Sequence, residues 1–294
     1  MVAPLAEFET QRGRLFGLAY RLLGSAAEAE DAVQDTYLRW SEADHEAVRT
    51  PAAWLAKVVT NLCLNRLTSA RAKRERYVGP WLPEPVLTDQ GALGPLETAE
   101  QRDSVSLAML VLLERLTPPE RAVFVLREAF GYGHREIAEV MDLSEANCRQ
   151  LYRRAGQRLA DRPRFQPDRA ANRRLADRFL RAARDGDLPA LESILAEDVT
   201  SWADGGGEVN TARRPITGRD RVARYLTGGL TKIPGELDFT YAEVNGAPGY
   251  LVAVAGTVLG LVTVEVQEDR IAAVHIVANP EKLTFVSAQL SRIG

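Results

Sequence analysis

The sequence predicts a multidomain protein in which two all-α domains are followed by an α+β domain. In the first 160 residues, apolar side chains recur every three or four positions, which is typical of helices packed around a core. Beyond residue 196 the pattern changes to short runs of Val, Ile, Thr and Leu, which is typical of strands. A proline-rich segment and a basic segment interrupt these regions. We therefore expect domains at 1–77, 99–162 and 172–294, with linkers at 78–98 and 163–171.

Composition and charge exclude several classes of protein. The chain has 294 residues, enough for two or three small domains. Its formal net charge is −3, so any contact with nucleic acid must come from local basic clusters. No apolar run approaches the length of a membrane span and the N-terminus lacks the apolar core of a signal peptide, so we expect a cytoplasmic protein. Cys63 and Cys148 have no metal-ligand spacing, and we expect no disulfide, metal or cofactor.

Three helices are expected in the first domain. An apolar stripe runs through 15–23, and Gly24-Ser25 ends that helix. The next helix, 29–40, has one buried stripe and one acidic face. A polar loop follows at 41–50, and Pro51 suits the first turn of a helix that continues to about residue 72. This third helix buries Trp54 and becomes basic toward its C-terminal end.

The second domain carries the pattern of a helix-turn-helix. A Thr-Pro-Pro-Glu sequence at 117–120 marks an earlier helix start. The short helix over 137–141 ends at Asp142-Leu143-Ser144, and Ser144 can cap the helix that follows. Four arginines form a stripe on that helix because residues three and four apart share a helical face. This arrangement is typical of a helix that enters the DNA major groove. A merely solvated basic face is the alternative interpretation.

The linker and the last domain have distinct patterns. The linker is expected to be extended because it contains Pro80, Pro83, Pro85 and Pro95. It also contains Trp81, whose exposure to water would be unfavourable, so we expect the linker to dock on a domain. A helical pattern over 172–196 has a break at Gly186. Runs at 249–255, 260–266 and 270–277 indicate strands, and we expect a curved antiparallel sheet.

Three segments together resemble the extracytoplasmic-function (ECF) class of bacterial sigma factors. They are AEDAVQDTYLRW (29–40), TPAAWLAKVVTNLCLNRL (50–67) and ERLTPPERAVFVLREAFGYGHREIAEVMDLS (114–144). The resemblance covers residues 1–160, and order, spacing and loop positions agree. It implies a transcription initiation factor whose partners are core RNA polymerase, through the β′ clamp helices and the β flap, and promoter DNA.

The resemblance also implies roles for residues of the first domain. The helix over 29–40 would dock on polymerase through Glu30, Asp31, Gln34, Asp35, Tyr37 and Trp40. The next helix would meet the −10 element through Asn61, Asn65, Arg66, Arg71, Lys73 and Arg74. In this class the loop at 41–50 holds a base extruded from the non-template strand. Here the loop has His45 but no aromatic residue, and Trp54 reads as a core residue rather than a stacking platform.

The second domain would recognise the −35 element. An arginine can pair bidentately with guanine and a glutamine with adenine, so the first turns of the recognition helix should carry the specificity. The candidate DNA-binding residues are Asn147, Arg149, Gln150, Arg153, Arg154 and Arg158. Arg158 lies farthest along the helix and would meet phosphate.

The C-terminal third resembles the SnoaL-like branch of the cone-shaped α+β fold shared with nuclear transport factor 2. One group of ECF factors carries such an extension with three motifs, WLPEP, DGGGK and NPDKL. Here they read Trp81-Leu82-Pro83-Glu84-Pro85, Asp204-Gly205-Gly206-Gly207-Glu208 and Asn279-Pro280-Glu281-Lys282-Leu283. Glu208 replaces lysine, a charge reversal at the end of the second motif. The resemblance implies that the extension is a fused regulator contacting the sigma domains, while a flexible hairpin tip is the alternative for the glycine loop.

Two other functions compete with the sigma-factor interpretation. A one-component DNA-binding regulator would sense a small ligand in the C-terminal cone. An enzyme would use Asp204, His275 and Trp202 within that cone, because a carboxylate in an apolar pocket can gain a raised pKa. No second acid–base partner is evident, however, and His275 lies on an apolar strand, so we expect no catalytic residues.

Overall fold

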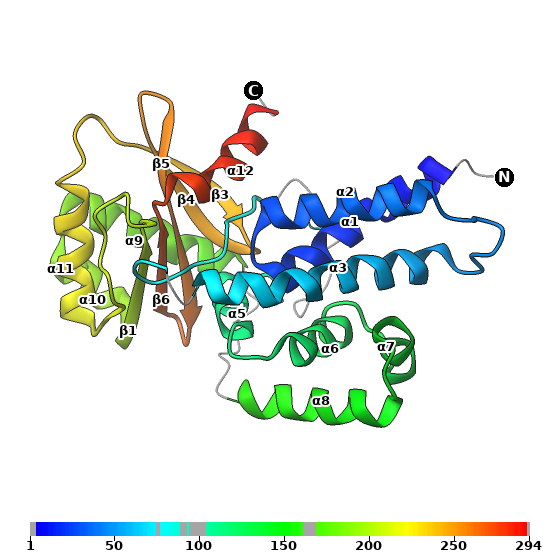
Figure 1. Cartoon of the computed structure of the whole chain (residues 1–294). Helices are drawn as coiled ribbons and strands as arrows, with labels where there is room; N and C mark the ends of the chain where they lie inside the picture. The colour runs from blue at the N-terminus through cyan, green and yellow to red at the C-terminus, as the bar shows by residue number, and fades with distance from the viewer. Residues whose placement is uncertain (1–3, 75–76, 89–92, 94–103, 161–168, 293–294) are drawn as a thin grey trace. The chain divides into compact units, whose positions relative to one another are not determined.

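The computed structural model describes all residues except 1–3, 75–76, 89–92, 94–103, 161–168 and 293–294, together with the side chains of 68–73 and 169. The chain divides into two compact units. Unit 1 comprises Met1–Arg76 and Gln90–Arg162, and unit 2 comprises Tyr77–Asp89 and Pro163–Gly294. Figure 1 shows helices throughout unit 1 and a sheet with helices in unit 2. The predicted fold class, two helical domains followed by an α+β domain, is confirmed.

Three long helices begin unit 1: α1 (Pro4–Leu23), α2 (Ala26–Ser41) and α3 (Pro51–Arg74). Gly24 adopts a φ of 67°, and the Ser25 side chain caps α2 by accepting a hydrogen bond from the Glu28 amide at 3.1 Å. The three helices pack on one another around an apolar core that includes Leu22, Leu23 and Leu55.

Among the described residues of unit 1, four shorter helices follow: α5 (Leu107–Leu113), α6 (Pro118–Glu128), α7 (His134–Met141) and α8 (Glu145–Arg158). Thr117 and Glu120 form the capping box at the start of α6, at the position where the Thr-Pro-Pro-Glu sequence predicts a helix start. Helices α6 and α7 also pack against the first three helices, through α1–α6, α3–α6 and α3–α7 contacts.

Unit 2 combines helices with one mixed sheet. Its helices are α9 (Arg169–Asp185), α10 (Leu188–Ile194), α11 (Arg219–Leu230) and α12 (Pro280–Ser291). Its strands are β1 (Leu195–Asp204), β2 (Ile216–Thr217), β3 (Asp238–Val244), β4 (Ala247–Val254), β5 (Thr257–Gln267) and β6 (Arg270–Val277). The helical pattern expected to reach residue 196 ends two residues earlier, because Leu195 already belongs to β1.

The prediction of an antiparallel sheet is wrong at one strand pair. The strand order is β2-β1-β6-β5-β4-β3, and every neighbouring pair is antiparallel except β1 and β6. Residues Ser201 to Asp204 run parallel to Val274 to Val277. Strand β1 is therefore inserted beside the last strand rather than joined to it by a hairpin.

Helices α9, α10 and α11 cover one face of this sheet. Their buried residues, among them Phe179, Leu191 and Val222, form one cluster with Val264 and Val274 of the strands. Side chains alternate between the faces of a strand, so His275, next to Val274, points to the opposite face. Trp202 pairs with His275 in the register of β1 and β6, and Asp204 lies two residues further along β1, so these three candidate residues share the face opposite the helices.

Candidate functional sites on the two units

The helix-turn-helix has the geometry that the sequence predicts. Asp142 ends α7 in a left-handed conformation with a φ of 54°, and the Ser144 side chain accepts a hydrogen bond from the Asn147 amide at 3.2 Å. Cys148 and Ala155 are the buried residues of α8. Leu151 and Tyr152 are half-buried, and the six predicted DNA-binding side chains are all exposed: Asn147, Arg149, Gln150, Arg153, Arg154 and Arg158.

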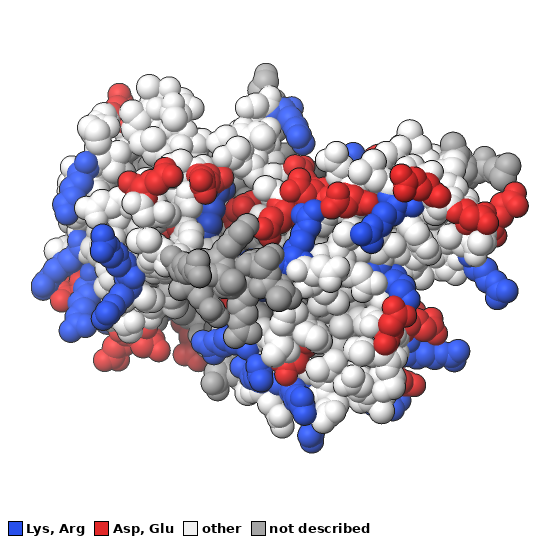
Figure 2. All heavy atoms as spheres, viewed as in Figure 1, with Lys and Arg blue, Asp and Glu red and all other residues white. Residues whose placement is uncertain are grey.

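Two of these arginines already have intramolecular partners. Arg149 forms an ion pair with Glu145, one turn earlier on the same exposed surface. Arg158 lies 3.3 Å from Glu120 and donates to the Arg115 carbonyl at 3.3 Å. Arg158 therefore links α8 to the segments beside it. Figure 2 shows basic side chains gathered along α8.

Helix α2 presents the predicted acidic surface, but with a different hydrophobic residue. Figure 2 shows a row of acidic side chains along α2, and Glu30, Asp31 and Gln34 are exposed. Trp40 is only 2% exposed and its indole N–H donates to the Pro4 carbonyl at 2.8 Å, so it lies in the core of unit 1, and its contact with polymerase stays a prediction. Leu38, which the sequence reasoning missed, is 52% exposed.

Arg66 also differs from its predicted placement. Its guanidinium donates to Asp35 at 2.7 Å and to the Glu28 carbonyl at 2.9 Å, and it lies 3.8 Å from Asp31. Arg66 thus faces α2 instead of standing beside Asn65, which is exposed. Helical spacing placed Arg66 and Asn65 on one face, but it does not show which way a long side chain turns. The Arg66 side chain turns toward the nearest carboxylates, which lie on α2.

Arg74, like Arg66, is a basic residue of α3 with a structural partner. It forms an ion pair with Glu114, which also binds Arg121, and it donates to the Leu23 carbonyl. Its side chain is 13% exposed, so in this conformation it is not displayed to DNA as predicted. Asn61 is half-buried. The side chains of Arg71 and Lys73 lie outside the described part of the structure.

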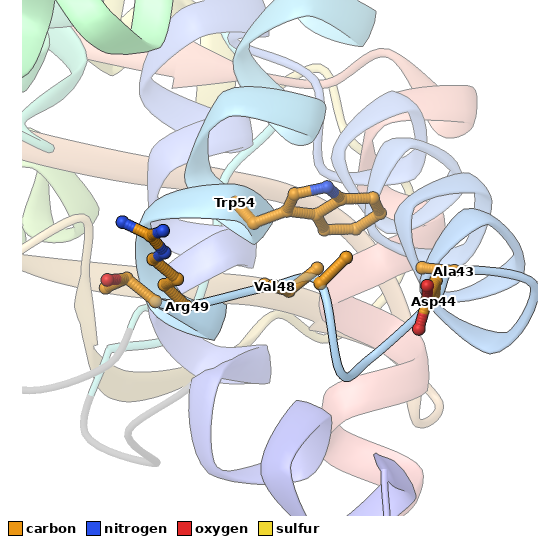
Figure 3. Close-up of a pocket in the computed structure, with 7 residues that line it drawn as sticks. Ala43, Asp44, Val48, Arg49 and Trp54 are labelled. Atoms are coloured by element: carbon orange, nitrogen blue, oxygen red, sulfur yellow. The ribbon is translucent and has the colours of Figure 1, made fainter.

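A pocket of about 450 Å³ lies in the loop before α3. Figure 3 shows the Trp54 indole along one side, facing Val48, with Arg49 and Asp44 at opposite ends. Trp54 is half-buried and contacts Trp40 with ring centroids 5.4 Å apart. Expecting Trp54 to be only a core residue was therefore incomplete, because one side of it lines the pocket.

In unit 2, the three motifs meet around one buried ion pair, which we name the linker clamp (Tyr77, Leu82, Asp204, Asn279 and Lys282). The Lys282 ammonium lies 2.7 Å from an Asp204 carboxylate oxygen, and the two side chains are 8% and 0% exposed. Lys282 also donates to the Leu82 carbonyl at 2.5 Å. The same Asp204 oxygen accepts the Leu82 amide at 2.8 Å. Carboxylate and ammonium together therefore hold both backbone groups of one linker residue.

Aromatic residues complete the clamp. Tyr77 donates its hydroxyl to the other Asp204 oxygen at 2.5 Å and accepts from the Asn279 amide group at 2.8 Å. Burial and the hydrogen bond to Asp204 raise the pKa of Tyr77, so this donor keeps its proton. The Lys282 ammonium also lies 4.6 Å from the Tyr77 ring centroid and 4.5 Å from that of Trp81. Sequence reasoning missed Tyr77, which immediately precedes the linker.

The glycine loop is tightly packed at the clamp. A Cβ on Gly205 would lie 2.2 Å from the Val209 carbonyl oxygen. Gly206 has a φ of 66°, and a Cβ there would lie 2.5 Å from the Asn279 side chain. Both positions therefore require glycine. Glu208 is exposed, and the cation of the clamp comes from Lys282, so the charge reversal at 208 leaves this ion pair intact.

The second half of the linker adds to the edge of the sheet. Val86 exchanges hydrogen bonds with Asn245, at 3.0 Å in each direction, and Leu87 forms an antiparallel bridge with Val244. Gln289 of α12 binds the Leu87 amide at 2.9 Å and its carbonyl at 3.2 Å. Leu82, Val86 and Leu87 are at most 1% exposed. The expectation that the linker docks on a domain is confirmed for residues 77–88.

The candidate catalytic residues do not share a cavity. Asp204 belongs to the clamp, while Trp202 and His275 stack with ring centroids 5.1 Å apart. His275 lies in the core, as its apolar strand suggests, but its buried Nδ1 has no hydrogen-bond partner among the described residues. Burial lowers the pKa of His275 to about 4, so it is neutral at pH 7 and forms no ion pair with Glu265, 3.7 Å away.

Known proteins match this chain over nearly its whole length. The models for sigma-70 region 2 and sigma-70 region 4 match residues 8–73 and 106–159. The ECF RNA polymerase sigma factor SigJ of Mycobacterium tuberculosis is 38% identical, over 95% of this chain and 93% of that protein. The probable ECF sigma factor SigI of the same species is 29% identical, over 97% and 96%. The crystal structure of Mycobacterium tuberculosis SigJ aligns with a TM-score of 0.76 and 34% identity, over 96% of this chain and 98% of that one.

Proposed function

Because this chain belongs to the family of ECF RNA polymerase sigma factors, we propose that it binds core polymerase, recognises −10 and −35 promoter elements and is restrained by its own C-terminal domain. The observation that carries the proposal is the linker clamp, since a buried ion pair of unit 2 holds the segment between the two sigma regions. Among the described helices, none has the length and apolar character of a membrane span. We place its action in the cytoplasm, with polymerase.

The polymerase contact is assigned to the exposed part of α2. Glu30, Asp31 and Gln34 supply a polar rim, and Leu38 supplies an apolar centre one turn further along the helix. Asp35 and Tyr37 lie half-buried beside this surface. Arg66 holds Asp31 and Asp35 in place from α3 and is assigned a positioning role.

DNA contacts are assigned to both domains of unit 1. The exposed side chains of α8 suit the major groove at the −35 element, with Gln150 and Arg153 as base readers and Arg158 as a support of the helix. The pocket beside Trp54 is assigned to the extruded base of the −10 element, because an indole face stacks on any base.

Regulation is assigned to the clamp. Leu82, Val86 and Leu87 are fully buried against unit 2, so the linker can take another path only if the clamp opens. We assign the clamp the role of a brake on initiation. The extension then acts by contact rather than by catalysis, because its buried carboxylate, Asp204, is occupied by four donors.

In vitro transcription with core polymerase tests this function. The full chain and its Lys282→Met variant are compared on a promoter library, with Glu208→Gln as the matched control because Glu208 is exposed beside the clamp. We expect polymerase-dependent initiation by all three proteins and higher activity for Lys282→Met. Lower activity in that variant would show that the clamp assists initiation. Tight promoter binding without polymerase would favour a one-component regulator instead.

A further inference from the structure

Unit 2 contains an apolar cavity that the clamp does not use. It measures about 180 Å³ and lies between helices α9 and α11 and the sheet. Phe179, Leu226 and Leu261 on its wall are 2%, 7% and 0% exposed. Val209 and Leu259, which also line it, are 40% and 39% exposed. The cavity therefore has a buried floor and an accessible apolar rim.

The lining defines the chemistry of a ligand. An apolar protein cavity of about 150 Å³ accommodates benzene, so a ligand here has the size of one substituted aromatic ring. The described lining residues include no charged side chain, which excludes an ionic ligand because its charge would be buried unpaired. Asn210, Thr211 and Tyr225 place polar groups at the cavity. One hydroxyl on the ligand could be satisfied there.

The cavity wall is continuous with the clamp. Ala278 lines the cavity, and its amide donates to the Asp204 carbonyl at 2.8 Å. Val209 lines it as well, and its amide donates to the Gly205 carbonyl at 3.0 Å. Thr211 donates its hydroxyl to the Ala203 carbonyl at 3.4 Å. Three lining residues thus bind the backbone of residues 203–205, and the Asp204 side chain holds Leu82.

We propose that this cavity binds a neutral, single-ring aromatic molecule and that binding loosens the linker clamp by displacing the loop around Asp204. The proposal rests on the proposed regulatory role of the clamp and identifies the chemical signal that would release it. A ring in the cavity contacts Val209, Thr211 and Ala278, which hold the backbone of residues 203–205. The tight packing of Gly205 against Val209 transmits a shift of Val209 to that loop, because the loop has no free space to absorb it.

Binding is measured first, by titrating the full chain with 4-methylphenol, and with benzoate as the charged comparison. Ala183→Leu tests the location, because Ala183 lines the cavity, is 4% exposed and would gain three carbons that fill the space. Ala171→Leu, on the same helix but outside the lining, is the matched control. Val209→Asp places a charge at the exposed rim, so it tests the same site if Ala183→Leu fails to fold.

We expect the wild type and Ala171→Leu to bind 4-methylphenol and to reject benzoate. Ala183→Leu and Val209→Asp should bind at least about tenfold more weakly. Equal binding by the wild type and both cavity variants, or no binding by the wild type, overturns the site. Either result leaves the transcription test of the clamp unaffected, so the two proposals fail separately.

Amide hydrogen exchange measures the coupling. The Leu82 amide is held by Asp204, whereas the Val86 and Thr88 amides are held by Asn245 and by the Glu243 carbonyl. Saturating 4-methylphenol should accelerate exchange at Leu82 and leave Val86 and Thr88 unchanged. Unchanged or slower exchange at Leu82 under saturation overturns the coupling.

Discussion

At the scale of single residues, the clamp depends on two buried charges that stabilise each other. Removing one partner of a buried ion pair destabilises a protein by about 3–5 kcal/mol, because the other charge stays buried and unpaired. We expect Lys282→Met to lower the free energy of unfolding of unit 2 by about this amount, since it leaves Asp204 without its cation. Urea denaturation at pH 7 checks the prediction.

The double variant Asp204→Asn/Lys282→Met separates pairing from packing. With both charges gone, no buried charge is left uncompensated, so the double variant should be more stable than the sum of the two single losses implies. Additive losses would show that the two charges do not interact.

His275 provides a pH prediction. Its pKa is lowered to about 4 by burial, whereas an exposed histidine titrates near 6.5. The unfolded chain therefore binds a proton at this position before the folded chain does. The stabilisation is fully present above pH 6.5 and is lost as the pH falls toward 4, with a total of about 3 kcal/mol.

His275→Gln tests that prediction because glutamine is polar but does not titrate. The stability of the wild type should fall more steeply than that of the variant between pH 6.5 and 4, measured by urea denaturation at several pH values. Parallel curves would mean that His275 is charged, or hydrated, in the folded protein.

At the scale of elements, α8 is the recognition helix and its exposed side chains should act unequally. Arg153 is exposed and forms no ion pair with the described residues. A bidentate contact between an arginine and a base contributes about 1–3 kcal/mol to discrimination between bases. We expect Arg153→Ala to reduce holoenzyme affinity for its preferred −35 sequence by roughly 5- to 150-fold and to relax specificity at one base pair. Binding measured on a −35 library at fixed salt checks this. Arg184→Ala, an exposed arginine of α9, is the control and should change nothing.

Elements with strong local signals were predicted well. The capping residues Thr117 and Ser144 lie at the helix starts that the sequence indicates, and Gly24-Ser25 separates two helices as predicted. Strands β4, β5 and β6 match three apolar runs. Strand β3 was missed although Asn245-Gly246, a strong hairpin signal, follows it.

Elements whose position depends on distant partners were not predictable in the same way. Strand β1 was not predicted because Glu197 and Asp198 interrupt its apolar pattern, and only its first two residues fell in the predicted helical segment 172–196. Its parallel pairing with β6 has no local signal. Trp40 was assigned to an interface because its residue type suits one, while its burial depends on a contact with Pro4. The motif residues of the clamp were identified, but Asn245 and Gln289 join them only through the tertiary fold.

At the scale of the whole molecule, buried ion pairs join separate segments of the chain in both units. In unit 2 such a centre is the clamp. In unit 1 such a centre is Glu114, which binds Arg74 at the end of α3 and Arg121 of α6. Arg121 is 2% exposed and also donates to the Arg21 carbonyl at 3.3 Å. The Glu114 centre therefore connects sigma region 2 to sigma region 4.

Glu114→Gln should weaken that connection. Burial raises the pKa of Glu114, but Arg121 and Arg74 outweigh it, so the pKa is lowered below its usual 4.5. The carboxylate therefore contributes stability that is present above pH 4.5 and is lost as the pH falls through the lowered value. Substitution leaves two buried guanidinium groups without their anion, and we expect unit 1 to lose about 3–5 kcal/mol at pH 7. The loss should shrink as the pH falls below 4.5, because the wild type then loses the same interaction.

Urea denaturation of the full chain at pH 7 and at pH 4 measures this difference, with Glu139→Gln as the control. Glu139 forms an exposed pair with Arg135 at 3.5 Å, and such pairs contribute at most about 1 kcal/mol. A Glu114→Gln effect as small as that of Glu139→Gln would show that regions 2 and 4 are held together without this centre. A large effect at pH 7 that shows no decrease in a series extending further below pH 4 would mean that packing by the Glu114 side chain, rather than its charge, joins the two regions.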